Sequence, residues 1–343
     1  MATLPTALLV SFFIAAGALI WWAGGVLSST TDAIDAKFGW GEGMGGAVFL
    51  AVATNLPEVA IIAGGAYSHS LGLAVGNILG GIAIQTVVLV LLDGPGLRSK
   101  MPLTYVVSSL TIALEGLVLI AILMFCILGT LSPPSLIFAR MTPAEVAILL
   151  TWIAGLWLVQ HNQDHAGWRI AREEIAAESK IVASSRRPFG QIVALFGIAA
   201  LATLGAGVVL ALSSAEIAAR FHIQGVLFGA TFLAAVTALP EVTTGMYAVR
   251  AGKYELAMSD IIGGNAFLPV LFLFGTLVSG QALLPDAQRP DLYLTALGAL
   301  LTAVYCVGVV LRSKRMLLGA GIDSLIVLGL YIIGIVGLFF IGP

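Results

Sequence analysis

Residues 53–58 read ATNLPE, and residues 236–241 read VTALPE. Each stretch places a glutamate directly after a proline, near the middle of roughly twenty residues that otherwise have the apolar composition of a membrane-spanning helix. A charged side chain at that depth costs about 3 kcal/mol even on lenient insertion scales, so it usually faces a water-filled cavity or a bound ion. Glu58 and Glu241 are therefore the first candidates for function.

The prolines add to this argument. A proline within a helix removes one hydrogen bond and displaces the carbonyl four residues earlier, here that of Ala53 or Val236. Freed carbonyls at membrane depth need a new partner, and a bare cation can provide one. Together with oxygen atoms from Thr54, Asn55 and Thr237, they predict an all-oxygen site suited to sodium or calcium rather than to zinc or copper. The alternative is a kinked helix whose protonated glutamate bonds to a neighbouring helix, but two copies at matched positions favour the cation.

The composition places the chain in a membrane. Of its 343 residues, 59% are hydrophobic and only 10% are charged, and the mean hydropathy is +1.04. That leaves too little polar surface for a soluble globule, so a polytopic membrane protein is expected. Nothing in the sequence indicates a nucleic-acid partner. Cys126 and Cys306 lie in apolar runs and match no metal or redox spacing, so we expect both to be core residues.

Ten apolar runs are long enough to cross a bilayer, and the first is expected to be a retained span rather than a cleaved signal. They are residues 5–29, 42–66, 70–92, 103–130, 141–160, 190–212, 224–248, 255–280, 291–311 and 321–341. Glycine, proline or polar residues interrupt the second, third, seventh and eighth, which are therefore expected to be broken helices lining a site.

The two halves of the chain align without a gap at an offset of 183 residues. LPEV at residues 56–59 recurs at 239–242, and Gly24, Gly46 and Gly80 fall on further glycines. Each unit has an odd number of spans, so the second copy must be inverted in the membrane. We predict an all-α polytopic membrane protein with ten transmembrane helices as two inverted five-helix repeats, at residues 1–160 and 190–343, joined by a linker at 161–189.

The basic residues predict the orientation. Thirteen of the lysines and arginines fall in the odd-numbered loops, including the linker 161–189, and three fall on the other side: Arg140, Arg220 and Arg289. The positive-inside rule then puts the linker in the cytoplasm and both termini outside, in a plasma or bacterial inner membrane.

Further polar residues occur at helical spacing in the third and eighth spans. Asn77, Gly81 and Gln85 recur every four residues and so share one face of a helix. At the corresponding positions of the eighth span are Asp260, Gly264 and Leu268, with Asn265 beside them.

These motifs resemble the two alpha repeats of the sodium/calcium exchanger membrane region, in the calcium/cation antiporter superfamily. TNLPE at residues 54–58 is followed by GNILGG at 76–81, and TALPE at 237–241 by SDIIGGN at 259–265. The family patterns are G-T-S-L-P-E and G-N-x-x-G-S-N, with nineteen residues from the glutamate to the first asparagine, and both pairs here keep that spacing. The alpha-1 motif covers about residues 50–92 and the alpha-2 motif about 233–275.

The resemblance implies that Glu58 and Glu241 are the paired central ligands of a divalent cation. It adds oxygen ligands from Thr54, Asn55 and Thr237. The polar residues of the third and eighth spans, Asn77, Gln85, Asp260 and Asn265, are the further candidate ligands. The chain also departs from the pattern, because Gly81 and Gly264 replace its serines, Ile82 replaces one asparagine, and Ala238 and Leu268 stand where polar residues are usual. It therefore resembles a divergent member in which several sodium ligands are missing.

The function expected on these grounds is secondary-active antiport, with no enzymatic activity and no bound cofactor. A cation, expected to be calcium, would bind between Glu58 and Glu241 and exchange for sodium or protons by alternating access. Because close carboxylates repel one another, protonation could neutralise the empty site during the return step. A channel would need a continuous polar pore, and an intramembrane enzyme would need a nucleophile with a base at mid-span. The remaining alternatives are a transport-dead scaffold or sensor that binds a cation, and a monovalent cation/proton antiporter.

Overall fold

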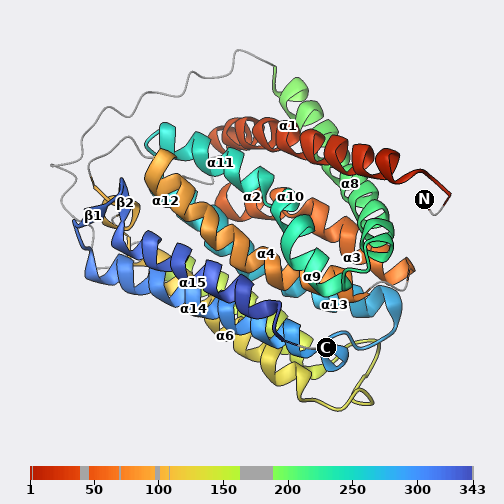
Figure 1. Ribbon diagram of the computed structural model, residues 1–343. Helices are drawn as coiled ribbons and strands as arrows, with labels where there is room; N and C mark the ends of the chain where they lie inside the picture. The colour runs from red at the N-terminus through yellow and green to blue at the C-terminus, as the bar shows by residue number, and fades with distance from the viewer. Residues whose placement is uncertain are drawn as a thin grey trace.

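The computed structural model describes residues 1, 3–38, 46–68, 71–96, 101–107, 109–162 and 188–341, and it is built almost entirely of helices (Figure 1). The elements of the first half are α1 (Thr6–Phe38), α2 (Gly46–Thr54), α3 (Leu56–Ser68), α4 (Leu71–Leu91), the π-helical turn η2 (Leu92–Gly96), α5 (Leu103–Val106), α6 (Thr111–Thr130) and α7 (Pro143–Asn162).

The second half follows the same plan. Its elements are α8 (Phe189–Arg220), α9 (Gly225–Phe228), the π-helical turn η3 (Gly229–Leu233), α10 (Ala234–Thr237), α11 (Leu239–Arg250), α12 (Tyr254–Phe267), α13 (Val270–Ser279), the 3₁₀ turn η4 (Leu284–Asp286), α14 (Arg289–Leu311), the hairpin strands β1 (Met316–Leu317) and β2 (Ala320–Gly321), and α15 (Ile322–Leu338).

All ten predicted spans contain helix within the described residues, and the predicted fold class is confirmed. Eight helical segments are long and apolar enough to cross a membrane, and two shorter apolar helices, Leu56–Tyr67 and Ile322–Leu338, account for parts of the second and tenth spans. Large apolar side chains remain exposed on the outside of the bundle, among them Leu117, Ile153, Leu201 and Ile333. Such an apolar surface suits contact with the lipid of a membrane. The boundaries predicted for the two repeats and the linker stay predictions, since residues 163–187 lie outside the described part.

The 183-residue offset also governs where helices begin. α1 and α8 begin at Thr6 and Phe189, and α4 and α12 begin at Leu71 and Tyr254. In the same register, α3 and α11 begin at Leu56 and Leu239. The duplication inferred from a few identical residues therefore extends to the helix pattern.

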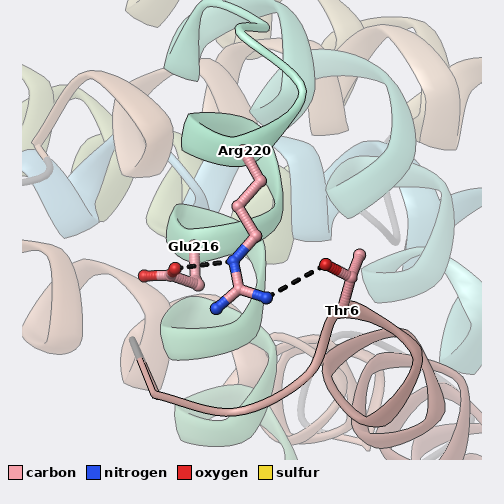
Figure 2. A network of polar contacts seen from close by, with 3 residues as sticks. All are labelled: Thr6, Glu216 and Arg220. Atoms are coloured by element: carbon pink, nitrogen blue, oxygen red, sulfur yellow. Dashed lines mark hydrogen bonds and ion pairs between the residues drawn. The ribbon is translucent and has the colours of Figure 1, made fainter.

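The two longest helices, α1 and α8, pack against each other in opposite directions. Near the end of α8, Arg220 donates from Nη1 to Thr6 Oγ1 at the start of α1 (3.0 Å) and from Nε to Glu216 Oε1 (2.8 Å; Figure 2). At the other end of the pair, Lys37 Nζ lies 3.4 Å from the ring centroid of Phe189. Equivalent helices that run antiparallel are what an inverted repeat requires. We call the two ends of the bundle the Thr6 end and the Lys37 end.

The helix breaks follow the prolines. The second span breaks at Asn55, just before Leu56-Pro57, and the eighth breaks between α12 and α13, at Leu268-Pro269. The seventh span is also divided, into α9, η3, α10 and α11. The prediction of a broken third span was wrong, because α4 is continuous from Leu71 to Leu91. The position equivalent to Pro269 in α4 is Thr86, which keeps its backbone N–H and so allows the helix to continue.

Glycines allow the two repeats to approach closely and symmetrically. A Cβ on Gly24 of α1 would lie 2.8 Å from Pro240 Cα, and a Cβ on the equivalent Gly207 of α8 would lie 2.9 Å from Pro57 Cα. Each long helix thus packs directly on the proline that precedes the candidate glutamate of the other repeat. This contact positions the two breaks at the centre of the bundle.

Candidate cation-binding site

All nine predicted site residues are buried. The exposed fraction is at most 1% for each of Thr54, Asn55, Glu58, Asn77, Gln85, Thr237, Glu241, Asp260 and Asn265. They come from the breaks of the second and seventh spans and from the faces of α4 and α12 that were predicted from helical spacing. Buried polar groups at membrane depth require hydrogen-bond or ion partners. The polar atoms that make no hydrogen bond therefore show where a ligand could bind.

The two glutamates face the opposite repeat. Glu58 follows Pro57 in the first turn of α3, and Glu241 follows Pro240 in the first turn of α11. The Thr237 hydroxyl lies close to the Glu58 carboxylate and the Thr54 hydroxyl close to the Glu241 carboxylate. Glu58 is also near enough to Glu241 for their charges to interact. The pair is therefore shared between the repeats.

Both threonine hydroxyls are directed elsewhere. Thr54 Oγ1 donates to Ala51 O (3.1 Å), and Thr237 Oγ1 donates to Asn77 Oδ1 (3.3 Å). The hydrogen bond between Thr237 and Asn77 joins α10 to α4, and so links one repeat to the other. No well-aligned donor reaches either glutamate from the described residues.

Asp260 and Asn265 of α12 each have hydrogen-bond partners on one polar atom of the side chain and none on the other. Asp260 Oδ2 accepts a hydrogen bond from Thr244 (2.6 Å), and the Asp260 charge also acts on Glu241. Asn265 Nδ2 donates to Thr86 Oγ1 (3.2 Å) and to the carbonyl of Ile82 (3.3 Å), the residue equivalent to Asn265 in the first repeat. These bonds fix the two side chains, while Asp260 Oδ1 and Asn265 Oδ1 are left free.

Eight side-chain oxygen atoms of the predicted residues have no hydrogen-bond partner among the described residues. They are Asn55 Oδ1, both carboxylate oxygens of Glu58, Gln85 Oε1, both carboxylate oxygens of Glu241, Asp260 Oδ1 and Asn265 Oδ1. No three His, Cys, Asp or Glu residues of the described chain are close enough to hold a metal by themselves. A cation here would therefore need amide, hydroxyl or backbone oxygen atoms besides the carboxylates, which suits a hard ion.

The departures from the family pattern have visible consequences. At Gly81, a Cβ would lie 3.7 Å from Leu268 Cδ1, so this side of the site is apolar. At Gly264, a Cβ would lie 3.1 Å from Asn55 Nδ2, whose amide already donates to Ala51 O (2.6 Å). Gln85 has no partner for either of its amide atoms. The arrangement offers fewer oxygen atoms around α4 and α12 than the family pattern implies.

Sequence reasoning missed three polar residues near this region. Thr244 and Thr86 orient Asp260 and Asn265, and neither stands out in an apolar helix because threonine commonly bonds to its own helix. The third is Glu115 of α6, which bonds to Ser259 of α12 (2.9 Å). A lone carboxylate in an apolar span was the signal that could have found it.

Comparison with known proteins decides the family. The sequence profile described as "Sodium/calcium exchanger protein" matches residues 8–159 and 191–340, which together make up most of the chain. The chain belongs to the sodium/calcium exchanger family. This exchanger is 27% identical over 278 residues to CaxA of Alkalimonas amylolytica, which is named as a candidate antiporter; the match covers 79% of this chain and 82% of CaxA. It is 26% identical over 308 residues to the inner membrane protein YrbG of Escherichia coli, covering 87% and 86% of the two chains.

Solved structures share the fold of this exchanger. The sodium-calcium exchanger NCX_Mj superposes with a TM-score of 0.61 at 17% identity, covering 97% of this chain and 99% of NCX_Mj. YfkE superposes with a TM-score of 0.66 at 14% identity, covering 98% and 93%. At these identities the likeness concerns the fold alone. The chain is thus an integral membrane transporter of the cation exchanger class and not an enzyme.

Proposed function

We propose that this exchanger is a secondary-active antiporter that binds calcium between Glu58 and Glu241 and exchanges it for protons or sodium by alternating access. The unpartnered, fully buried oxygen atoms of the site are the observation that carries this proposal. Calcium takes about six to eight oxygen ligands, which is the number left without partners here. Relatives named as an exchanger and as an antiporter support a transport function over that of a cation-binding scaffold or sensor.

The supply of ligands favours protons, or protons with one sodium, as the coupling ions. Separate sodium sites would each need several oxygen atoms, and Gly81, Gly264, Ala238 and Leu268 contribute no side-chain oxygen. Leu268 faces Gly81 with an apolar group. The empty site would hold Glu58 and Glu241 close together, and protonation of either one relieves their repulsion. Coupling to several sodium ions is therefore the less favoured mechanism.

Ion-dependent thermal unfolding of the purified protein tests the binding step. A ligand that binds only the folded state at a concentration of 100 times its Kd stabilises by about 2.7 kcal/mol. We expect calcium to raise the unfolding midpoint more than magnesium, potassium or sodium does. A shift with sodium or potassium and none with calcium would instead indicate the monovalent cation/proton antiporter.

Flux measurements test the transport step. Protein reconstituted in liposomes loaded with calcium should release it under an imposed pH gradient, and a sodium gradient should add little. Release that is steeply cooperative in sodium and indifferent to pH would contradict the proposed coupling. Calcium-dependent stabilisation without flux under either gradient would identify a scaffold or sensor and overturn the antiporter.

A further inference from the structure

A second polar group lies outside the central site, near the start of α6. Glu115 Oε1 accepts a hydrogen bond from Ser259 Oγ of α12 (2.9 Å), although the two residues are 144 positions apart in the sequence. Glu115 Oε2 is inaccessible to solvent and has no hydrogen-bond partner among the described residues. A carboxylate in an apolar helix with one inaccessible oxygen that lacks a partner calls for a ligand or a proton.

The pair borders a cavity of about 40 Å³ between α2, α6, α7 and α12. Glu115 and Ser259 are the polar side chains of its lining, which is otherwise apolar and includes Trp152 and Leu156. About 10–15 Å³ of such volume is enough to hold one water molecule, so the cavity has room for one or a few waters. It does not have the oxygen atoms to hold calcium, because a single carboxylate and a hydroxyl are far short of about six ligands.

The cavity adjoins the central site from the Lys37 end. Ser259 directly precedes Asp260 in α12, and Gly263, which also lines the cavity, directly precedes Gly264. Ala51 of α2 lines the cavity as well and accepts the hydrogen bonds of Thr54 and Asn55. A proton held at Glu115 is therefore next to α12, the helix that also carries Asp260 and Gly264 of the central site.

The pair breaks the symmetry of the repeats. At the offset of 183 residues, Glu115 corresponds to Gly298 and Ser259 to Gly76. A Cβ on Gly76 would lie 2.5 Å from Val226 O, and a Cβ on Gly298 would lie 3.0 Å from Ile82 Cγ2. At the Thr6 end, close packing leaves no room for a side chain at the positions where the Lys37 end has a carboxyl group and a hydroxyl group.

We propose that Glu115, held by Ser259, is a proton-binding site on the Lys37 side of the exchanger, separate from the central cation site and absent from the Thr6 side. In the conformation described here, Glu115 is the neutral acid: Oε1 accepts the hydrogen bond from Ser259 and Oε2 carries the proton. Loss of that proton leaves a carboxylate with only the Ser259 hydrogen bond in an apolar cavity, which favours separation of α6 and α12 or entry of water. Proton release is thereby coupled to opening of this side.

Few other ionisable groups surround Glu115. The carboxylate of Glu255, exposed in the first turn of α12, repels a negative charge on Glu115. α2 and α7 line the cavity with apolar residues and Gly155, and from α14 the Cys306 thiol packs on Gly116. No described basic residue lines the cavity to hold an ionised Glu115.

Infrared difference spectroscopy between acidic and alkaline pH tests the proposal without depending on transport. The wild-type spectrum should contain a carboxylic acid C=O band that is lost in Glu115→Gln, while the bands of the central carboxylates remain. The exposed Glu255→Gln is the matched control and should keep the band. The assignment would be overturned if the two proteins gave the same spectrum in the acid C=O region. It would also be overturned if the bands absent from Glu115→Gln were those of an ionised carboxylate at every pH.

A second variant keeps the test decisive if Glu115→Gln does not fold. Ser259→Ala retains the carboxyl group but removes its hydrogen bond, so the same band should move to higher frequency; an unmoved band counts against the pair.

Calcium-dependent stabilisation of Glu115→Gln should equal that of the wild type if the sites are separate, and its loss would place Glu115 in the central site. If calcium stabilises neither protein, the proposed central function fails and the infrared result still decides on Glu115.

Discussion

Glu58 and Glu241 differ from the other buried carboxylates of the described chain in having both oxygens without hydrogen-bond partners. Glu145, for comparison, is as deeply buried but accepts hydrogen bonds from Thr276 and from the Thr142 N–H, where it completes the capping box of α7. A carboxylate that stabilises a fold has its acceptors occupied. The two central glutamates do not, which is costly for the empty protein and useful only if a cation or a proton completes them.

This contrast predicts separate effects on stability and binding. Glu58→Gln or Glu241→Gln removes one of two repelling charges, so the ion-free protein should unfold at the same temperature as the wild type or higher. The rise in unfolding midpoint with calcium should be lost in either variant. The double variant should add little further loss, since residues of one site are not additive.

Glu145→Gln serves as the contrasting variant. Glutamine also completes a capping box, so this variant should leave both the midpoint of the ion-free protein and the calcium-induced rise nearly unchanged. Retention of the full calcium effect in either central single variant would refute the shared site.

At the level of helices, α4 packs closely on the α9–η3 segment through a glycine whose equivalent in α12 has no such contact among the described residues. A Cβ added to Gly80 would clash with the backbone of Ala230. The equivalent Gly263 has no described atom within 4 Å of such a Cβ and lines the cavity beside Glu115. The described contacts of these two glycines therefore differ, although the repeat makes their positions equivalent.

The glycine pair gives a matched test of that asymmetry. Gly80→Ala should destabilise the protein by about 1–3 kcal/mol through overpacking against Ala230. Gly263→Ala should be neutral or stabilise by up to about 1 kcal/mol, because the helix gains rigidity and no atom must move. Thermal or denaturant unfolding in the same detergent measures both. Equal destabilisation by the two substitutions would show that Gly263 is packed as closely as Gly80.

Much of this arrangement was readable from the sequence because it depends on local signals. Hydropathy placed the helices, Pro57 and Pro240 marked the breaks of the second and seventh spans, and the recurrence of LPEV set the register in which α1 and α8 begin. The helical spacing of Asn77 and Gln85 put them on one buried face. The continuity of α4 was missed because polar residues were taken as interruptions, although only a proline removes a backbone donor.

The remaining features depend on contacts between distant segments. Nothing near Glu115 in the sequence indicates Ser259 as its partner, and nothing near Thr86 indicates Asn265. The cavity likewise arises from the packing of four helices rather than from any one of them. Repeat symmetry predicts where two copies agree, but it cannot predict where packing makes them differ.

At the scale of the whole molecule, α1 and α8 run antiparallel, and both chain ends lie opposite the β1–β2 hairpin in Figure 1. This arrangement leaves two possible orientations in the membrane. Arg312, Lys314 and Arg315 lie at the hairpin side, while Arg140 lies at the other end, where Nη1 donates to Leu277 O. We propose that the Lys37 end faces the cytoplasm, because basic residues are retained on that side during insertion. The proton site at Glu115 would then be on the cytoplasmic half.

Two exposed residues in short loops test this orientation. Gln281 follows α13 at the Thr6 end, and Ser313 follows α14 at the Lys37 end. An impermeant thiol reagent added to intact cells should label Gln281→Cys and not Ser313→Cys, and permeabilised cells should show labelling of both. The native Cys126 and Cys306 are buried and should contribute little background. Labelling of Ser313→Cys alone in intact cells would reverse the orientation, and it would move the Glu115 site to the external side without altering the contacts on which that site rests.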